Sequence, residues 1–146
     1  MKISQTMLFM FVGSFLIQYF LMPPIMVNNR GEITNNIGKV YMSVIMALFM
    51  VLLEVLMHDH QYHVLSMNLY VILIASLGFF IYLYRKQIAI KDKQYLEGMI
   101  EHHSMGILTS EEILKKTDNY NVAKLAKNII QTQKDEINIM NEILRI

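Results

Sequence analysis

The chain has 146 residues, of which 54% are hydrophobic and 17% are charged, and it contains no cysteine. Soluble domains usually carry about 25% charged residues, so this composition disfavours an ordinary soluble protein. The missing cysteine excludes disulfide frameworks, thiolate zinc sites and iron–sulfur clusters, and a net charge of +1 gives no basic surface for nucleic acid.

Charged residues are unevenly distributed along the chain. Residues 1–84 contain six of them and residues 85–146 contain the other nineteen. Three long apolar runs fall in the first part, and each approaches the ~20 residues that a helix needs to cross a bilayer. Such spans must be helical, because backbone groups in lipid have no water to pair with. We therefore predict a membrane domain over residues 1–84, with three spans at about 7–27, 40–57 and 64–84.

A cleaved signal peptide is the competing interpretation of the first run, and it fits poorly because no A-x-A-like site follows and two further spans come after it. Pro23 and Pro24 predict that its helix ends or kinks at that point. Residues 28–39 and 58–63 have the composition of connecting loops. Residues 85–94 contain no Gly or Pro, and we expect a helical linker there that continues the third span into the tail.

The tail, residues 95–146, is predicted to be a soluble helical hairpin domain. Residues 95–114 and 122–144 each place apolar side chains at spacings of three and four, which is typical of amphipathic helices. The polar break between them offers Asp118 or Asn119 as N-cap and is short enough for an antiparallel arrangement. No strand pattern is present, so the predicted fold class is all-α. Because about fifty residues make a thin core, we expect a homo-oligomer.

Sulfur, imidazole and oxygen side chains gather at one level of the predicted hairpin. Met99, His102 and His103 share one face of the first helix, and folding the chain near residue 118 brings part of the second helix opposite them. Thioethers select soft ions such as copper(I) and silver(I), and imidazole suits several transition metals. The alternative is that these side chains only fill the core. The candidate metal ligands are Met99, His102, His103, Gln133, Glu136 and Met140.

The same residues carry a resemblance. Residues 95–103 read Tyr-Leu-Glu-Gly-Met-Ile-Glu-His-His, and the second helix contains Ile-Ile-x-x-Gln-x-x-Glu-Ile-x-x-Met. These motifs resemble the bacterial domain-of-unknown-function family 305, and the apolar runs are similar to its membrane-anchored subgroup. The resemblance implies a ferritin-like helical hairpin and handling of copper or silver, without a settled activity. Two positions depart from the family pattern. The family often has proline where this chain has Glu101, and often has methionine or a similar residue near Ser110.

Three features of the apolar part have both a functional and a structural interpretation. Glu54 lies near the end of the second span, where it is either a transport residue or a neutral structural partner. The stripe of Met42, Met46 and Met50 either passes copper(I) along a helix or packs against neighbouring helices. A third group of residues either binds a metal ion or forms an exposed polar loop. Its members are His58, Asp59, His60 and His63.

The sequence thus predicts a membrane-anchored helical protein whose hairpin binds copper, or silver, for sequestration, sensing or delivery. The alternatives are a metal-independent interaction module that forms an oligomeric bundle, and a small transporter subunit that uses Glu54. No nucleophile–base pair or phosphate loop is present, so we do not expect an enzyme. The expected partners are the lipid bilayer, further copies of the chain and the metal ion, without nucleic acid. The expected location is a bacterial inner or plasma membrane. Its orientation stays open, because the positive-inside rule places the tail in the cytoplasm whereas the resemblance favours the outside.

Overall fold

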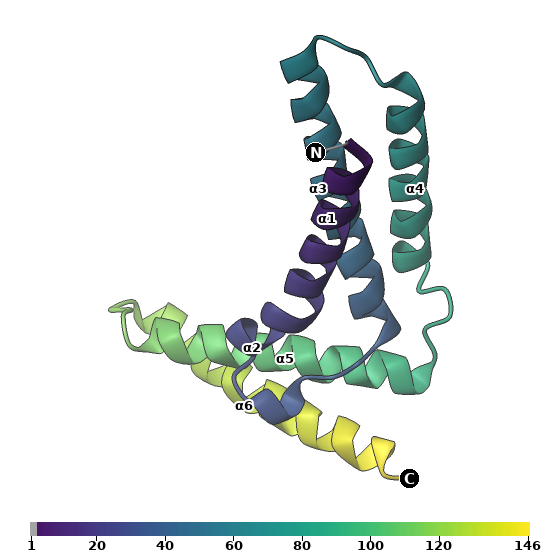
Figure 1. Ribbon diagram of the computed structural model, residues 1–146. Helices are drawn as coiled ribbons and strands as arrows, with labels where there is room; N and C mark the ends of the chain where they lie inside the picture. Colours follow the sequence, from purple (N-terminus) through teal and green to yellow (C-terminus); the bar gives the residue numbers. More distant parts are fainter. Residues whose placement is uncertain (1–2) are drawn as a thin grey trace. The chain divides into compact units, whose positions relative to one another are not determined.

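The computed structural model describes residues 3–146, which form helices joined by short loops (Figure 1). No strand occurs within that range, which confirms the all-α prediction. The chain divides into two compact units, which we call the apolar unit (residues up to Met22, with Ile37–Ala89) and the tail unit (Pro23–Asn36 with Ile90–Ile146). The elements are α1 (Ile3–Leu16), η1 (Ile17–Leu21), α2 (Pro23–Met26), η2 (Arg30–Glu32), α3 (Ile37–Tyr62), α4 (Met67–Arg85), α5 (Asp92–Leu114) and α6 (Tyr120–Leu144).

The apolar unit consists of helices that pack on α3. Three helical segments are long and apolar enough to cross a membrane, namely Ile3–Met26, Ile37–Tyr62 and Met67–Arg85. Both α1 and α4 contact α3, and the core between them contains Ile45, Leu48, Val51 and Val55 of α3 with Leu73 and Leu77 of α4. Most of the remaining apolar side chains on these helices stay uncovered by protein. The prediction of three helices of membrane-spanning length is confirmed.

The first of these segments changes its helical register before the proline pair. Residues Ile17–Leu21 form a π-helical turn, and the amide of Met22 donates to the carbonyl of Ile17 at 3.0 Å. Pro23 and Pro24 have no N–H to offer to the carbonyls four residues earlier, so a regular α-helix cannot run through them. The predicted interruption at the prolines is confirmed.

The linker between α4 and α5 is not helical, so the prediction of a helical linker over residues 85–94 is wrong. Helix α4 ends at Arg85 and α5 begins at Asp92. Between them Gln87 and Ala89 have φ values of 52° and 62°, a left-handed conformation that a right-handed helix does not tolerate. The carbonyl of Ile88 accepts a hydrogen bond from Tyr41 Oη at 2.9 Å, which fixes this turn to α3. Tertiary contact therefore overrides the local sequence here.

The tail unit is built on α5 and α6, which lie side by side (Figure 1). Their shared core consists of Ile100 and Ile107 from α5 with Ile137 and Met140 from α6. Helix α6 begins where the polar break ends, because the side chain of Asn119 accepts hydrogen bonds from the amides of Asn121 and Val122. Asn119 is therefore the N-cap of α6, and of the two predicted candidates, Asp118 and Asn119, the structure selects the second.

The segment Pro23–Asn36 belongs to the tail unit, which the sequence did not indicate. The hydroxyl oxygen of Ser104 accepts a hydrogen bond from the amide of Asn28 at 2.9 Å. The carboxylate of Glu101 accepts from the amide of Thr34 at 3.0 Å, and the Thr34 hydroxyl donates to the carbonyl of Glu97 at 2.8 Å. Ser104 and Glu101 are both buried. Two faces of α5 are thus occupied, one by α6 and one by this segment.

Candidate metal site between α5 and α6

His103 is the best-positioned of the candidate ligands. Its Nδ1 lies 2.7 Å from the carbonyl oxygen of Met99, one turn earlier on α5, and its Nε2 lies 2.9 Å from Oε2 of Glu136 on α6. A carbonyl oxygen can only accept, so Nδ1 carries the proton in that contact. The second nitrogen is then the one presented to α6, where it lies beside the Glu136 carboxylate. The ring is only 13% exposed, so its position is well defined.

Gln133 lies one turn from Glu136 on the same helix and faces α5. A Cβ atom placed on Gly106 would come within 2.2 Å of Gln133 Oε1, so the amide rests directly on the backbone of α5. Only glycine leaves room for this approach. Gln133 Oε1 is buried and accepts no hydrogen bond within the described part of the chain. A buried acceptor without a protein donor is unusual in folded proteins, so Gln133 Oε1 is a candidate ligand atom.

The two methionines lie in the apolar core instead of on an open face. Met140 is 8% exposed and belongs to the buried cluster with Ile100, Ile107 and Ile137, and Met99 packs against that cluster. Both thioethers therefore fill space between the helices.

His102 takes a different direction from His103. The ring centroids of the two histidines are 6.1 Å apart with their planes at 88°, and His102 is exposed. The difference follows from the ~100° between consecutive helical residues. The structure therefore pairs His103 with Glu136, places Gln133 next to that pair and puts the methionines in the core. Across residues 3–146, no three His, Asp or Glu side chains are grouped so that they could hold a metal ion.

The candidate residues of the apolar unit are dispersed. Met42 and Met46 are 42% and 44% exposed on α3 and lie outside the core of this unit, whereas Met50 of the same stripe is half-buried. The methionines that do pack in that unit are Met7 and Met10 of α1. Glu54 is half-buried on α3.

The predicted loop at residues 58–63 is mostly helical, because α3 continues to Tyr62. Asp59 is buried, and its carboxylate accepts hydrogen bonds from the amide of Ser66 at 2.6 Å and from the Ser66 hydroxyl at 2.9 Å. His58 Nδ1 lies 3.2 Å from the same carboxylate, whereas His60 and His63 are exposed. The interpretation of these residues as an exposed polar loop is thus wrong for Asp59.

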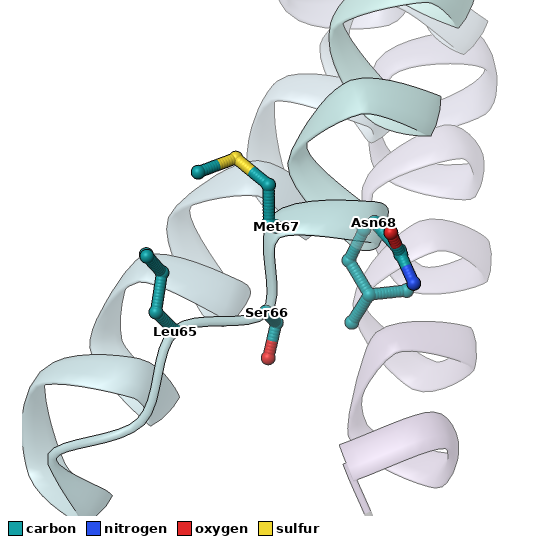
Figure 2. A pocket seen from close by; sticks show the side chains of 5 residues that line it. Leu65, Ser66, Met67 and Asn68 are labelled. Atoms are coloured by element: carbon teal, nitrogen blue, oxygen red, sulfur yellow. The ribbon is translucent and has the colours of Figure 1, made fainter.

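Asp59 connects the end of α3 to the start of α4 and was missed as a structural residue. Ser66 precedes the first turn of α4, beside an open hollow lined by residues 65–69 (Figure 2). A serine directly before an apolar run is a typical helix start. That signal could have indicated that the amide and hydroxyl of Ser66 donate to a nearby carboxylate. In the structure, the role of Asp59 is to fix the turn between α3 and α4 through its hydrogen bonds with Ser66.

Comparisons with known proteins match both parts of the chain. Residues 82–144 match the family model described as Domain of unknown function (DUF305). The uncharacterized protein L153 of Acanthamoeba polyphaga mimivirus is 35% identical over 142 residues, which cover 97% of this chain and 92% of that relative. The chain belongs to the DUF305 family. The DUF305 match spans α5 and α6, which confirms the family that the motifs resemble. The similarity to the viral protein extends over the apolar unit of this DUF305 chain as well. No solved structure matches it.

Proposed function

We propose that α1, α3 and α4 anchor this DUF305 protein in a lipid bilayer. The support is the length of the three apolar segments together with the apolar side chains that they leave uncovered, such as Leu8, Phe9 and Ile74, which are 64%, 73% and 61% exposed. Exposed apolar surface of this extent is unfavourable in water and favourable in lipid.

Extraction of membranes with alkaline carbonate tests the anchoring. We expect the full chain to stay with the membrane pellet, because three apolar helices insert effectively irreversibly. Release into the supernatant would contradict the proposed anchoring.

We further propose that α5 and α6 form an antiparallel hairpin, half of a ferritin-like bundle, which binds copper(I) or silver(I) as cargo for sequestration, sensing or delivery. The observation that carries this proposal is the geometry of His103. Metal-binding histidines commonly donate one ring N–H to a backbone carbonyl, which fixes the ring and directs the other nitrogen to the metal. His103 has that arrangement, with Nδ1 on the Met99 carbonyl and Nε2 at the interface with α6.

The neighbouring side chains fit a soft ion. The thioethers of Met99 and Met140 lie in the same interface and are the ligands that copper(I) and silver(I) prefer. Gln133 supplies a buried oxygen that accepts nothing from the described residues. Glu136 would release His103 Nε2 when a metal ion takes its place. Such an ion would lie shielded from water between two helices.

Competitive titration of the full chain in mild detergent tests the metal proposal, with a copper(I) chelator as competitor under reducing conditions. We expect His103→Ala to weaken copper(I) affinity by about tenfold or more. His102→Ala is the matched control, since the exposed ring does not face α6, and it should change affinity much less. Equal copper(I) affinity of the wild type and the His103 variant would overturn the proposal.

The second candidate function is a metal-independent interaction module. The packing of Met99 and Met140 favours it, because methionine side chains commonly fill a core without binding a metal ion. The variants Met99→Leu and Met140→Leu separate the two functions, because this exchange nearly conserves volume and usually costs less than about 1.5 kcal/mol. Loss of copper(I) affinity with intact thermal stability supports the metal site. Unchanged affinity supports the interaction module.

A further inference from the structure

Helix α6 carries two apolar stripes, and one of them packs against α5 within the described tail unit. The first stripe faces α5 and includes the buried residues Ala126, Ile137 and Met140. The second lies about a quarter turn away around the helix. Its members alternate at spacings of three and four, which is the heptad spacing of a coiled-coil seam. We call it the outer stripe, and it consists of Val122, Leu125, Ile129, Thr132, Glu136, Ile139 and Ile143, with Ile146 two residues after the end of the helix.

Most of the outer stripe is open to solvent, whereas Ile129 is half-buried and Glu136 contacts His103 of α5 while its side chain stays 49% exposed. Leu125, Ile139 and Ile143 are 60%, 54% and 51% exposed, although they are large and apolar. The element that packs along α6 is α5, which lies against the first stripe. Tyr120, in the first turn, is the one exposed large apolar residue of α6 away from the outer stripe. Scattered apolar residues are ordinary on protein surfaces, but a seven-residue heptad series is a helix-packing surface.

The order of residues in the outer stripe identifies its partner. The stripe has the same polarity pattern when it is read backwards around residue 134. Val122 then corresponds to Ile146, Leu125 to Ile143 and Ile129 to Ile139. The two polar members, Thr132 and Glu136, correspond to each other. A surface that matches its own reverse is complementary to a second copy related by a two-fold axis.

We propose that a second copy of the chain covers the outer stripe, with the two α6 helices antiparallel and the central layers formed by Thr132 and Glu136. In that arrangement each apolar side chain meets an apolar one, and each Glu136 carboxylate faces a hydroxyl. A parallel arrangement would place two Glu136 carboxylates opposite each other, which is costly when they are desolvated. Two α5–α6 pairs joined in this way form a four-helix bundle. The inference rests on the spacing and exposure of α6 and does not depend on metal binding.

Disulfide cross-linking of the full chain in mild detergent tests the arrangement, and the chain is suited to it because it has no cysteine of its own. We expect the double variant Leu125→Cys/Ile143→Cys to form covalent dimers upon oxidation with diamide. Each single variant should cross-link far less, because the antiparallel register separates equal positions by 18 residues, or about 27 Å along the helix. The double variant Lys124→Cys/Glu142→Cys is the matched control, with the same spacing on an exposed face away from the stripe.

Each outcome decides the proposal. Dimers from the Leu125/Ile143 double variant alone support it, and they should be lost when Ile139→Lys is added to that variant. Ile139 is half exposed, so the lysine leaves the α5–α6 core intact, which helical circular dichroism checks. Equal cross-linking of the Leu125→Cys single variant would replace the antiparallel register with a parallel one. If neither double variant cross-links, the stripe faces lipid or another protein, and the proposal is wrong.

Discussion

Replacing Ile107 by alanine is expected to lower the free energy of unfolding of the tail unit by about 2–5 kcal/mol. Ile107 is 1% exposed and lies in the middle of the core with Ile100, Ile137 and Met140. Its removal leaves a cavity that the surrounding helices fill only in part. Urea-dependent proteolysis of the tail unit in the detergent-solubilised chain measures the change.

The control for this variant is Ile113→Ala on the same helix. Ile113 is 41% exposed and lies outside the buried cluster, so the same deletion should change stability by a small fraction of that amount. A similar loss of stability in both variants would mean that the core described between α5 and α6 does not hold the unit together.

Replacing Glu101 by alanine is expected to detach the segment Pro23–Asn36 from α5. Glu101 is 6% exposed, and its carboxylate accepts a hydrogen bond from the amide of Thr34 at 3.0 Å. The Thr34 hydroxyl, which donates to the Glu97 carbonyl, lies 3.3 Å from the same carboxylate. Hydrogen bonds to charged groups contribute about 1.5–3 kcal/mol, so the Thr34 amide should exchange its hydrogen roughly ten to a hundred times faster. Hydrogen exchange followed by mass spectrometry measures that rate in the intact chain.

Glu111→Ala is the comparison for this experiment. Its carboxylate pairs with Lys134 at 3.2 Å across α5 and α6, with side chains that are 36% and 51% exposed. Exposed ion pairs contribute about 0–1 kcal/mol, so exchange at Thr34 should stay as in the wild type. The variant Glu101→Gln keeps an acceptor oxygen and should restore part of the protection. Equal exchange in Glu101→Ala and the wild type would contradict the docking described here.

The sequence was informative where local rules decide the structure. Long apolar runs, the proline pair and the Asn119 cap each depend on residues within one or two turns, and the structure has helices and interruptions at those places. The family could also be recognised from the sequence, because its motifs are short and lie within α5 and α6. Local rules failed at residues 86–91, where no Gly or Pro breaks the helix. There a hydrogen bond from Tyr41, 47 residues earlier, fixes a turn.

The candidate site was harder to predict, because periodicity does not tell which neighbour a face meets. The adjacent His102 and His103 looked equivalent in the sequence, but only His103 contacts α6. Glu101 was noted only as a departure from the family pattern. Its role depends on Thr34, 67 residues away in sequence.

The docking of Pro23–Asn36 on α5 also sets an order of events during biosynthesis. Asn28 leaves the ribosome 76 residues ahead of Ser104, the residue to which its amide binds. At about 5–20 residues per second, this segment waits roughly 4–15 seconds for its partner helix. During that time α3 and α4 are made, so the tail unit closes after their synthesis. If these helices cross a bilayer as we propose, both parts of the tail unit must lie on the same side of it. Any chain that stops before α5 leaves the first loop without the helix on which it folds.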